Sequence, residues 1–201
     1  MMLREADIAG IHIFDEETQS YNRPLLSKYS LSSTCVLIGG YTRQQCLMVR
    51  KKNPKRIKGV DDLLRVGVKL ANRNLGSGTR MLLDHNLREL AREKGVDFTS
   101  LTERISGYGM ELMTHFQVAK AVLSKRADVG VGLTPVAASM GLLAIPFAVE
   151  NYDFVVERRR RNPYVGEFLS LLSRDSFQKH VEATTPGISF TSHTGKILSI
   201  T

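Results

Sequence analysis

Apolar and polar positions alternate along part of the chain and repeat at helical spacing along the rest. Two-residue alternation and short apolar runs predict strands at residues 7–14, 34–39, 45–49, 66–70, 127–132, 142–147 and 152–156. Helical spacing predicts helices at 60–64, 79–94, 112–123, 134–140 and from 163 through 181. The polar tail from 184 to 201 is expected to be irregular. Strands that alternate with helices indicate an α/β fold with a largely parallel sheet.

The segment 72–80, Asn-Arg-Asn-Leu-Gly-Ser-Gly-Thr-Arg, joins a predicted strand to a predicted helix. Such a junction points unpaired backbone N–H groups at one spot, and the helix dipole places partial positive charge there. Ser77 and Thr79 add hydroxyl donors, and Arg73 and Arg80 add charged ones. In parallel sheets, ligands bind at the carboxyl ends of strands, which is where this loop lies. The segment therefore predicts an oxyanion pocket, with a simple tight turn as the alternative.

The glycines of this loop fit neither common nucleotide pattern. No Gly-Lys-Ser/Thr follows them, as a P-loop requires, and the third glycine of a dinucleotide fingerprint would fall at Met81. A small tetrahedral or planar anion therefore fits better than a nucleotide.

A second loop, 106–109, leads toward a helix whose start carries Thr114 and His115. Thr114 is equally typical of a helix N-cap, and His115 of a histidine on a helix surface. If this helix faces the first loop, Tyr108, Thr114 and His115 line the same cleft.

Catalytic and metal-binding patterns are weak. Ser77 does not lie in a Gly-x-Ser-x-Gly elbow, although an arrangement of Ser77, His115 and an aspartate stays open. The five histidines are scattered without metal-ligand spacing, so neither a metal site nor a cofactor is expected. They are His12, His85, His115, His180 and His193. We expect a protein that binds without catalysis.

The net charge of +8 favours anionic partners. Basic residues cluster at 50–58 and at 158–161, either as solvated loops or as patches that attract a small anion or nucleic acid. The absence of tryptophan weakens a single-stranded nucleic-acid platform, and no helix-turn-helix is evident, because a long loop separates the helices from 79 and from 112.

Composition indicates an ordinary globular chain, with 42% hydrophobic and 24% charged residues. The charged residues within the first twenty argue against a signal peptide, and no apolar run approaches the roughly 20 residues that span a bilayer. Cys35 and Cys46 are the only cysteines and are expected to be free thiols. These features predict a soluble, cytoplasmic protein without a membrane partner.

Several segments together resemble the periplasmic-binding-protein-like domain found in molybdenum-related proteins. They are 45–49, 53–54, 59–63, 72–80, 114–115, 118–119, 121–122, 127–132, 152–153, 186–187 and 194–195. In that family the domain is fused to the molybdopterin biosynthesis protein that inserts molybdenum, or to the helix-turn-helix domain of a transcriptional regulator. The segment from Gly76 to Arg80 also resembles the oxyanion loop of phosphate- and tungstate-binding proteins.

The resemblance implies a type II binding-protein fold, in which two α/β lobes are joined by crossing hinge strands. Residues 1–49 and 150–201 would form lobe 1, and residues 50–149 would form lobe 2, with 45–49 and 152–156 as the hinge strands. The implied anion contacts are Ser77, Gly78 and Thr79, with Arg73 and Arg80 nearby and Tyr108, Thr114 and His115 across the cleft. From lobe 1, His12 and Asn22 match cleft-facing positions.

One departure from the family is large. The family's first lobe begins with a strand, an anion-contacting loop, a helix and a further strand before the segment that matches residues 6–10. Lobe 1 is therefore expected to be truncated at its N-terminus. Either a partner chain or self-association would cover its exposed edge, or the chain comes from a truncated reading frame.

The leading hypothesis is a cytoplasmic sensor or delivery domain that binds molybdate, tungstate or a molybdopterin-related ligand. Two alternatives stay open at this point. One is a regulator domain that contacts nucleic acid through the basic blocks. The other is a cofactor-biosynthesis enzyme that acts on a phosphorylated substrate.

Overall fold

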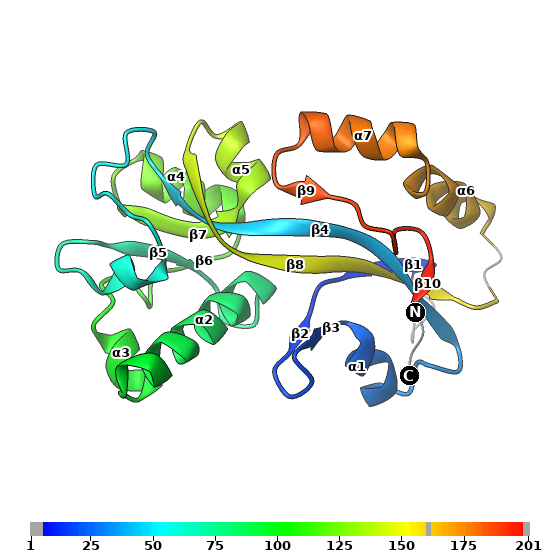
Figure 1. Cartoon of the computed structure of the whole chain (residues 1–201), viewed down its shortest axis with the longest axis horizontal. Coiled ribbons are helices and arrows are strands. Elements are labelled where there is room, and N and C mark those ends of the chain that lie inside the picture. Colours follow the sequence, from blue (N-terminus) through cyan, green and yellow to red (C-terminus); the bar gives the residue numbers. More distant parts are fainter. Residues whose placement is uncertain (1–5, 160–161, 199–201) are drawn as a thin grey trace. The chain divides into compact units, whose positions relative to one another are not determined.

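The computed structural model describes residues 6–159 and 162–198. It divides into two units, which we call unit 1 (1–43 and 150–201) and unit 2 (44–149). The chain passes from one unit to the other inside two long strands, β4 (Cys35–Val49) and β8 (Leu143–Glu157) (Figure 1).

Unit 2 is a sheet with helices on both faces. Its elements are η1 (Val60–Leu64), β5 (Leu70–Arg73), α2 (Gly78–Lys94), α3 (Phe98–Glu103), β6 (Glu111–Leu112), α4 (His115–Leu123), β7 (Val129–Leu133), α5 (Thr134–Ser139) and its parts of β4 and β8. The strand order is β4-β7-β5-β6. β5 runs parallel to β6 and β7, whereas β4 and β7 are antiparallel.

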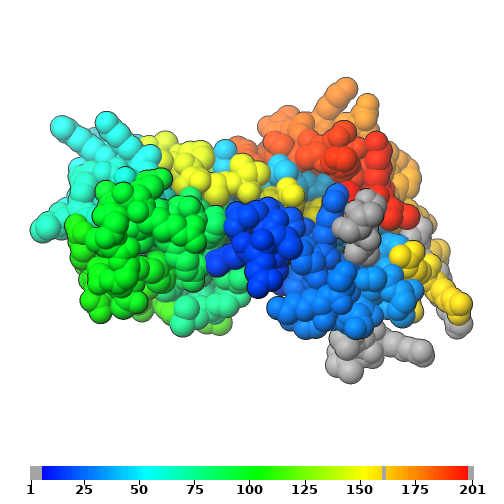
Figure 2. Space-filling view, turned by 60° about the horizontal axis from the view of Figure 1, so that its bottom comes forward, coloured from blue at the N-terminus to red at the C-terminus, as the bar shows by residue number. Residues whose placement is uncertain are grey.

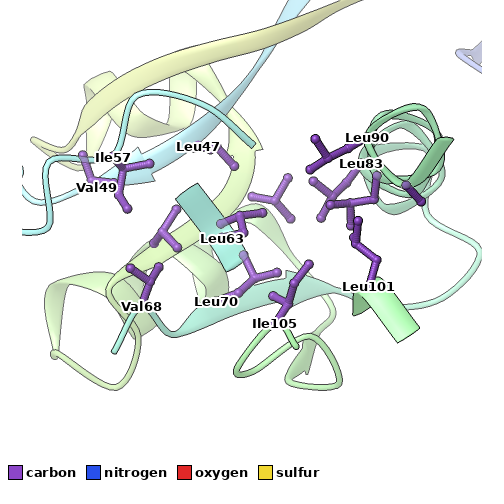
Figure 3. Packing of buried hydrophobic residues seen from close by; sticks show 14 residues of the cluster. Leu47, Val49, Ile57, Leu63, Val68, Leu70, Leu83, Leu90, Leu101 and Ile105 are labelled. Carbon is purple, nitrogen blue, oxygen red and sulfur yellow. The ribbon is translucent and has the colours of Figure 1, made fainter. Parts of the chain in front are cut away.

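The two faces of this sheet carry separate apolar clusters. Leu47 and Val49 of β4 pack with Val129, Val131 and the leucines of α2, on what we call the α2 face (Figure 3). Cys46 and Met48 pack with the buried side of α4, on what we call the α4 face. Strand side chains alternate between faces, so consecutive residues of β4 serve different cores.

Helix α2 begins and ends where its sequence dictates. Ser77 is its N-cap, and Gly95 follows its last turn in the left-handed conformation that glycine adopts at little cost. Leu83, Leu87 and Leu90 are almost fully buried along one side. The predicted helix with its glycine stop is therefore confirmed.

Unit 1 contains a sheet with short helices on both faces. Its elements are β1 (Ile8–Ile11), β2 (Phe14–Asp15), β3 (Ser20–Tyr21), α1 (Arg23–Lys28), α6 (Pro163–Leu172), α7 (Asp175–Thr184), β9 (Ile188–Ser189), β10 (Ile197–Leu198) and its parts of β4 and β8. β1 pairs antiparallel with β8, and β9 and β10 pair antiparallel with β4. Leu26 of α1 packs on one face, and Val165 of α6 packs on the other.

The α/β fold is confirmed, but the predicted sheet direction is wrong. Parallel pairing between named strands in the described residues is confined to β5 with its two neighbours. The pairs β1–β8, β2–β3, β4–β7, β4–β9 and β4–β10 are antiparallel.

Several predicted boundaries also need correction. The strands at 34–39 and 45–49 are one strand, as are those at 142–147 and 152–156. The strand predicted at 66–70 begins only at Leu70, and Val66 is fully exposed. The tail contains two short strands that pair with β4.

The buried side of α4 also differs from the prediction. The spacing 112, 116, 119, 123 predicted the apolar side, but Phe116 and Leu123 are exposed. Ala119 is buried as predicted, but the rest of the buried side consists of Val118, Ala121 and Val122. Leu112 lies in β6, before α4 begins at His115.

Candidate anion-binding site

The carboxyl end of β5 leads into α2 through a short loop. Gly76 has φ of 81°, in the left-handed region that favours glycine, and Ser77 follows in extended conformation. This path sets the first turn of α2 directly after the strand end. It is the strand-loop-helix junction that the sequence predicted.

Ser77 acts as the N-cap of α2. Its Oγ donates to the Asn74 carbonyl at 2.9 Å and accepts from the Arg80 N–H at 3.3 Å. The hydroxyl proton is therefore already used within the loop, and the chief role visible for this side chain is to fix the helix start.

The next two backbone N–H groups are the free donors of the junction. In the part of the chain that the structure describes, no backbone carbonyl accepts from the N–H of Gly78 or Thr79. The first N–H groups of a helix have no partner inside it, and the dipole of this 17-residue helix adds partial positive charge. Gly78 and buried Thr79 thus present two donors near the carboxyl end of β5.

Arg73 lies at the end of β5 on the α4 face and holds the loop before α4. Its Nε donates to the Leu112 carbonyl at 3.2 Å, and its Nη2 donates to the Met113 carbonyl at 3.0 Å. Its Nη1 lies 3.0 Å from Nε2 of His115. Partial burial lowers the pKa of Arg73 from its ordinary value, and no described carboxylate comes within 4.0 Å of it, so its positive charge is not neutralised by an ion pair.

Arg80 lies on the α2 side inside a buried polar network. Its Nε donates to Asp84 at 2.9 Å, its Nη1 lies 3.5 Å from Glu111, and its guanidinium carbon lies 4.1 Å from the centre of the Tyr108 ring. The Tyr108 hydroxyl donates to the same Asp84 oxygen at 2.8 Å. Burial raises the pKa of Tyr108. Arg80 and Tyr108 are thereby engaged with protein groups.

Thr114 and His115 begin α4 at the same edge of the sheet. Thr114 and Gln117 form a reciprocal capping box, which confirms the N-cap alternative for Thr114. His115 lies beside Arg73 and against Gly132, where an added Cβ would be 3.4 Å from its Nδ1. The structure thus brings Arg73 and His115 together on the α4 face, whereas Ser77, Arg80 and Tyr108 belong to α2 and its contacts.

His12 and Asn22 belong to unit 1. The His12 ring stacks on Tyr152 with ring centres 5.4 Å apart, and its Nδ1 lies 3.4 Å from buried Glu150, which also pairs with Arg43. Asn22 is fully buried; its Oδ1 accepts from Ile13 and its Nδ2 donates to Asp153. Asn22 therefore ties the β2–β3 hairpin to β8, and its polar atoms are used there.

Three acidic or polar residues of unit 2 were missed by sequence reasoning. Asp84 and Glu111 neutralise Arg80, and the i,i+4 spacing of Arg80 and Asp84 is a detectable signal for such a pair. Gln45 is completely buried on β4. Its signal is its place in the inward series 45, 47, 49, where every other member is apolar.

Unit 1 has a polar cavity of about 360 Å³ that the sequence did not indicate. Its lining includes Tyr21, Arg23, Gly40, Asp153, Thr191 and His193. The Gly40 N–H donates to Oδ1 of Asp153 at 3.0 Å, so this buried carboxylate is hydrogen-bonded to the backbone.

The basic block at 50–58 is only partly a solvated patch. Arg50 donates to the carbonyls of Val122 and Ala127 and pairs with Asp128. Lys51, Lys52 and Lys58 are exposed, and Figure 2 shows this segment, in cyan, on the surface of unit 2. Of the block at 158–161, Arg158 donates to the Ser32 carbonyl, and residues 160–161 lie outside the described residues.

The amino-acid sequence matches a known protein family. The model of the PBP superfamily domain matches residues 1–173. The chain belongs to the PBP superfamily. This membership suggests a ligand-binding or sensor role for the PBP domain.

Two uncharacterized proteins are similar to this chain in sequence. The uncharacterized protein YvgK of Bacillus subtilis (strain 168) is 36% identical over 155 residues, which is 77% of this chain and 48% of YvgK. The chain thus spans about half the length of that relative. An uncharacterized protein in the 5′ region of a ferredoxin 2Fe-2S gene of Clostridium pasteurianum is 30% identical over 125 residues. The match covers 59% of this chain and 98% of the clostridial protein.

Solved structures show the same fold. A structure of PEB3 with bound L-phospholactate matches with a TM-score of 0.63 at 15% identity, over 94% of this chain and 81% of PEB3. An ABC transporter protein of Clostridium perfringens ATCC 13124 matches with a TM-score of 0.58 at 12% identity, over 97% and 72% of the two chains. The predicted type II binding-protein fold is confirmed.

Two features are absent from the described residues, 6–159 and 162–198. No helix is both long and apolar enough to cross a bilayer. No group of three or more His, Cys, Asp or Glu side chains is placed to hold a metal ion in residues 6–159 and 162–198. Cys35 and Cys46 are both buried free thiols.

Proposed function

We propose that unit 2 binds a small oxyanion at the N-terminus of α2, and that the domain senses or delivers this ligand in the cytoplasm. Molybdate and tungstate are the simplest candidates, together with an oxyanion carried by a molybdopterin-related ligand. The observation that carries the proposal is the pair of N–H groups of Gly78 and Thr79, which have no partner among the described residues, at the start of a long helix.

Charge at this edge supports the same ligand class. Arg80 is neutralised by Asp84 and Glu111, whereas Arg73 has no described carboxylate partner and keeps its full charge. An anion at the edge would therefore meet the helix dipole on one side and Arg73 on the other side of the sheet. In PEB3, which shares the fold, the bound molecule is also an anion, L-phospholactate.

The decisive experiment removes one N–H and leaves the helix intact. Gly78 is the first residue of α2, the position at which proline is favoured in helices. Gly78→Pro removes the donor, and the matched control Gly78→Ala keeps it. Calorimetric titration with molybdate, tungstate, sulfate and phosphate measures the affinity of each variant.

Gly78→Pro should weaken binding of the best oxyanion roughly tenfold to a hundredfold, because a hydrogen bond to a charged group is worth about 1.5–3 kcal/mol. Gly78→Ala should bind the same oxyanion within about threefold of the unchanged chain, since it retains the backbone N–H of residue 78. No heat with any oxyanion, or equal binding by the two variants, would reject the α2 site.

A further inference from the structure

One amide side chain of unit 2 is buried and has no hydrogen-bond partner among the described residues. Gln45 is 0% exposed, and neither its Nε2 nor its Oε1 has a partner in the described residues. Its neighbour Gln44 differs, because its Oε1 accepts from the Thr134 hydroxyl at 3.0 Å. A buried amide without partners is costly, so this side chain calls for an explanation.

The strand register places Gln45 on the α2 face. Gln45 pairs with Leu133, Leu47 with Val131, and Val49 with Val129. Because side chains alternate, Gln45 shares a face with Leu47 and Val49, which pack in the cluster that includes Leu83 of α2 (Figure 3). Gln45 is thus the outermost member of the row that α2 covers.

The same register places Gln45 at the end of the sheet where α2 begins. Leu133, its pairing partner, is the last residue of β7. β5 runs parallel to β7, with Leu70 opposite Val129, so both strands end at this edge. The helix starts five residues after the end of β5, with Gly78. The unpartnered amide and the two free N–H groups therefore belong to one edge and one face.

The amide differs chemically from the other groups of the site. Backbone N–H groups and guanidinium groups only donate, whereas a glutamine side chain donates through Nε2 and accepts through Oε1. A fully ionised oxyanion such as sulfate or molybdate only accepts, so it satisfies Nε2 and leaves Oε1 buried without a donor. A ligand with its own O–H beside the anionic oxygens satisfies both.

We propose that Gln45 selects oxyanions that carry a proton-bearing oxygen, such as hydrogen phosphate or an anionic group next to a hydroxyl. This inference rests on the proposed function, and it narrows the ligand away from free molybdate and tungstate. The cost of an unsatisfied buried acceptor corresponds to a preference of roughly tenfold to a hundredfold.

The test compares inorganic phosphate with sulfate and molybdate on the whole chain by calorimetric titration at neutral pH. The unchanged chain should bind phosphate at least about tenfold more tightly than either fully ionised anion. Gln45→Met removes both polar atoms at nearly the same length, and it should reduce this ratio to about threefold or less. The matched control Gln44→Met changes the adjacent residue on the opposite face and should keep the ratio.

A second readout needs no ligand. Because an unsatisfied buried amide is replaced by an apolar group of similar shape, Gln45→Met should leave the midpoint of thermal unfolding unchanged or raised. A clearly lowered midpoint would show that the amide already has partners and would overturn the inference.

The outcomes separate this inference from the proposed function. Equal binding of phosphate, sulfate and molybdate by the unchanged chain, with weakening by Gly78→Pro, would keep the α2 site and reject selection by Gln45. A preference for phosphate that persists in Gln45→Met would also reject selection by Gln45 and leave the proposed α2 site in place. If Gln45→Met does not fold, Gln45→Asn, whose amide is shorter, takes its place. A preference for phosphate below about tenfold in the unchanged chain, or one that Gln45→Asn retains in full, would then reject selection by Gln45.

Discussion

Arg80 shows how a residue in a binding motif can serve the fold instead. The segment 72–80 predicted it as an anion donor, yet it is 4% exposed and holds Asp84, Glu111 and the Tyr108 ring. An arginine so enclosed needs its carboxylate, because a buried charge without a partner is strongly destabilising.

Asp84→Asn should therefore lower the free energy of unfolding by up to about 3–5 kcal/mol, since it removes the nearer carboxylate and leaves buried Arg80 only the more exposed Glu111, 3.5 Å away. Tyr108→Phe removes only the hydroxyl that donates to the same carboxylate, and it should cost about 1 kcal/mol. Urea denaturation of both variants checks this order. A cost for Asp84→Asn below that of Tyr108→Phe would show that the ion pair is not what holds Arg80.

Sequence reasoning predicted the local geometry of the strand-helix junction better than the partners of its arginines. The junction at 72–80 and the capping role of Thr114 follow from local sequence. That Arg73 faces carbonyls while Arg80 faces carboxylates depends on residues 112–113 and 111, which only the folded chain brings near. Local patterns carry no information on such distant pairs.

At the scale of elements, helix ends were predictable because side chains next to them decide where they form. Helix α3 was not predicted, although its N-cap, Asp97, is of the usual capping type and its Oδ1 accepts from the Ser100 N–H at 2.9 Å. The hydrogen bonds from Ser100 lower the pKa of the Asp97 carboxyl below its ordinary value.

This shift predicts a pH-dependent stability. A carboxyl whose pKa is lowered by folding stabilises the chain above its unfolded pKa of about 3.9, and the contribution is lost as the pH falls through the folded value. Asp97→Ala should therefore lower the unfolding midpoint by a constant amount between pH 6 and 8. The difference should shrink below about pH 4.

Asp97→Asn is the matched control, because it keeps a capping oxygen without a titrating group. The unfolding midpoint of Asp97→Asn should differ from that of the unchanged chain only through the lost charge. This difference in midpoint should disappear at low pH, where the Asp97 carboxyl is protonated. Thermal unfolding across this pH range measures both variants. An Asp97→Ala effect that stays constant down to pH 3 would mean that the carboxylate charge contributes nothing.

The long strands were less predictable than the helices. The sequence predicted one strand ending at Gly39 and another beginning at Gln45, but Gly39 and Gly40 lie inside the single strand β4. A Cβ on Gly40 would come within 2.0 Å of the Tyr152 carbonyl, and one on Gly39 within 2.3 Å of the His193 carbonyl. These glycines permit close backbone approach inside a sheet, which sequence periodicity does not distinguish from a turn.

At the scale of the whole chain, two units with separate cores carry two candidate ligand regions. The α2 junction belongs to unit 2, and the polar cavity near Arg23 and His193 belongs to unit 1. Hydrogen exchange can tell them apart, because a bound ligand slows local opening where it binds.

With saturating inorganic phosphate, amides of residues 74–80 should exchange more slowly, while those of residues 19–23 should not change. The central strand β7 is buried throughout and should be among the slowest segments with or without ligand. Mass spectrometry of peptides after timed exchange resolves these segments. Protection confined to 19–23 and 191–193 would move the site to unit 1.

The free N–H groups of Gly78 and Thr79 have a consequence for how the site can change over evolution. Every amino acid except proline supplies the same backbone donor, so most substitutions at these two positions would leave the donors in place. Relatives that have lost the ability to hold an anion should then differ at the cap, at Ser77, or by a proline in the first turn, rather than by loss of a conserved binding side chain. A comparison of relatives should therefore look for changes at Ser77 and in the first turn of α2.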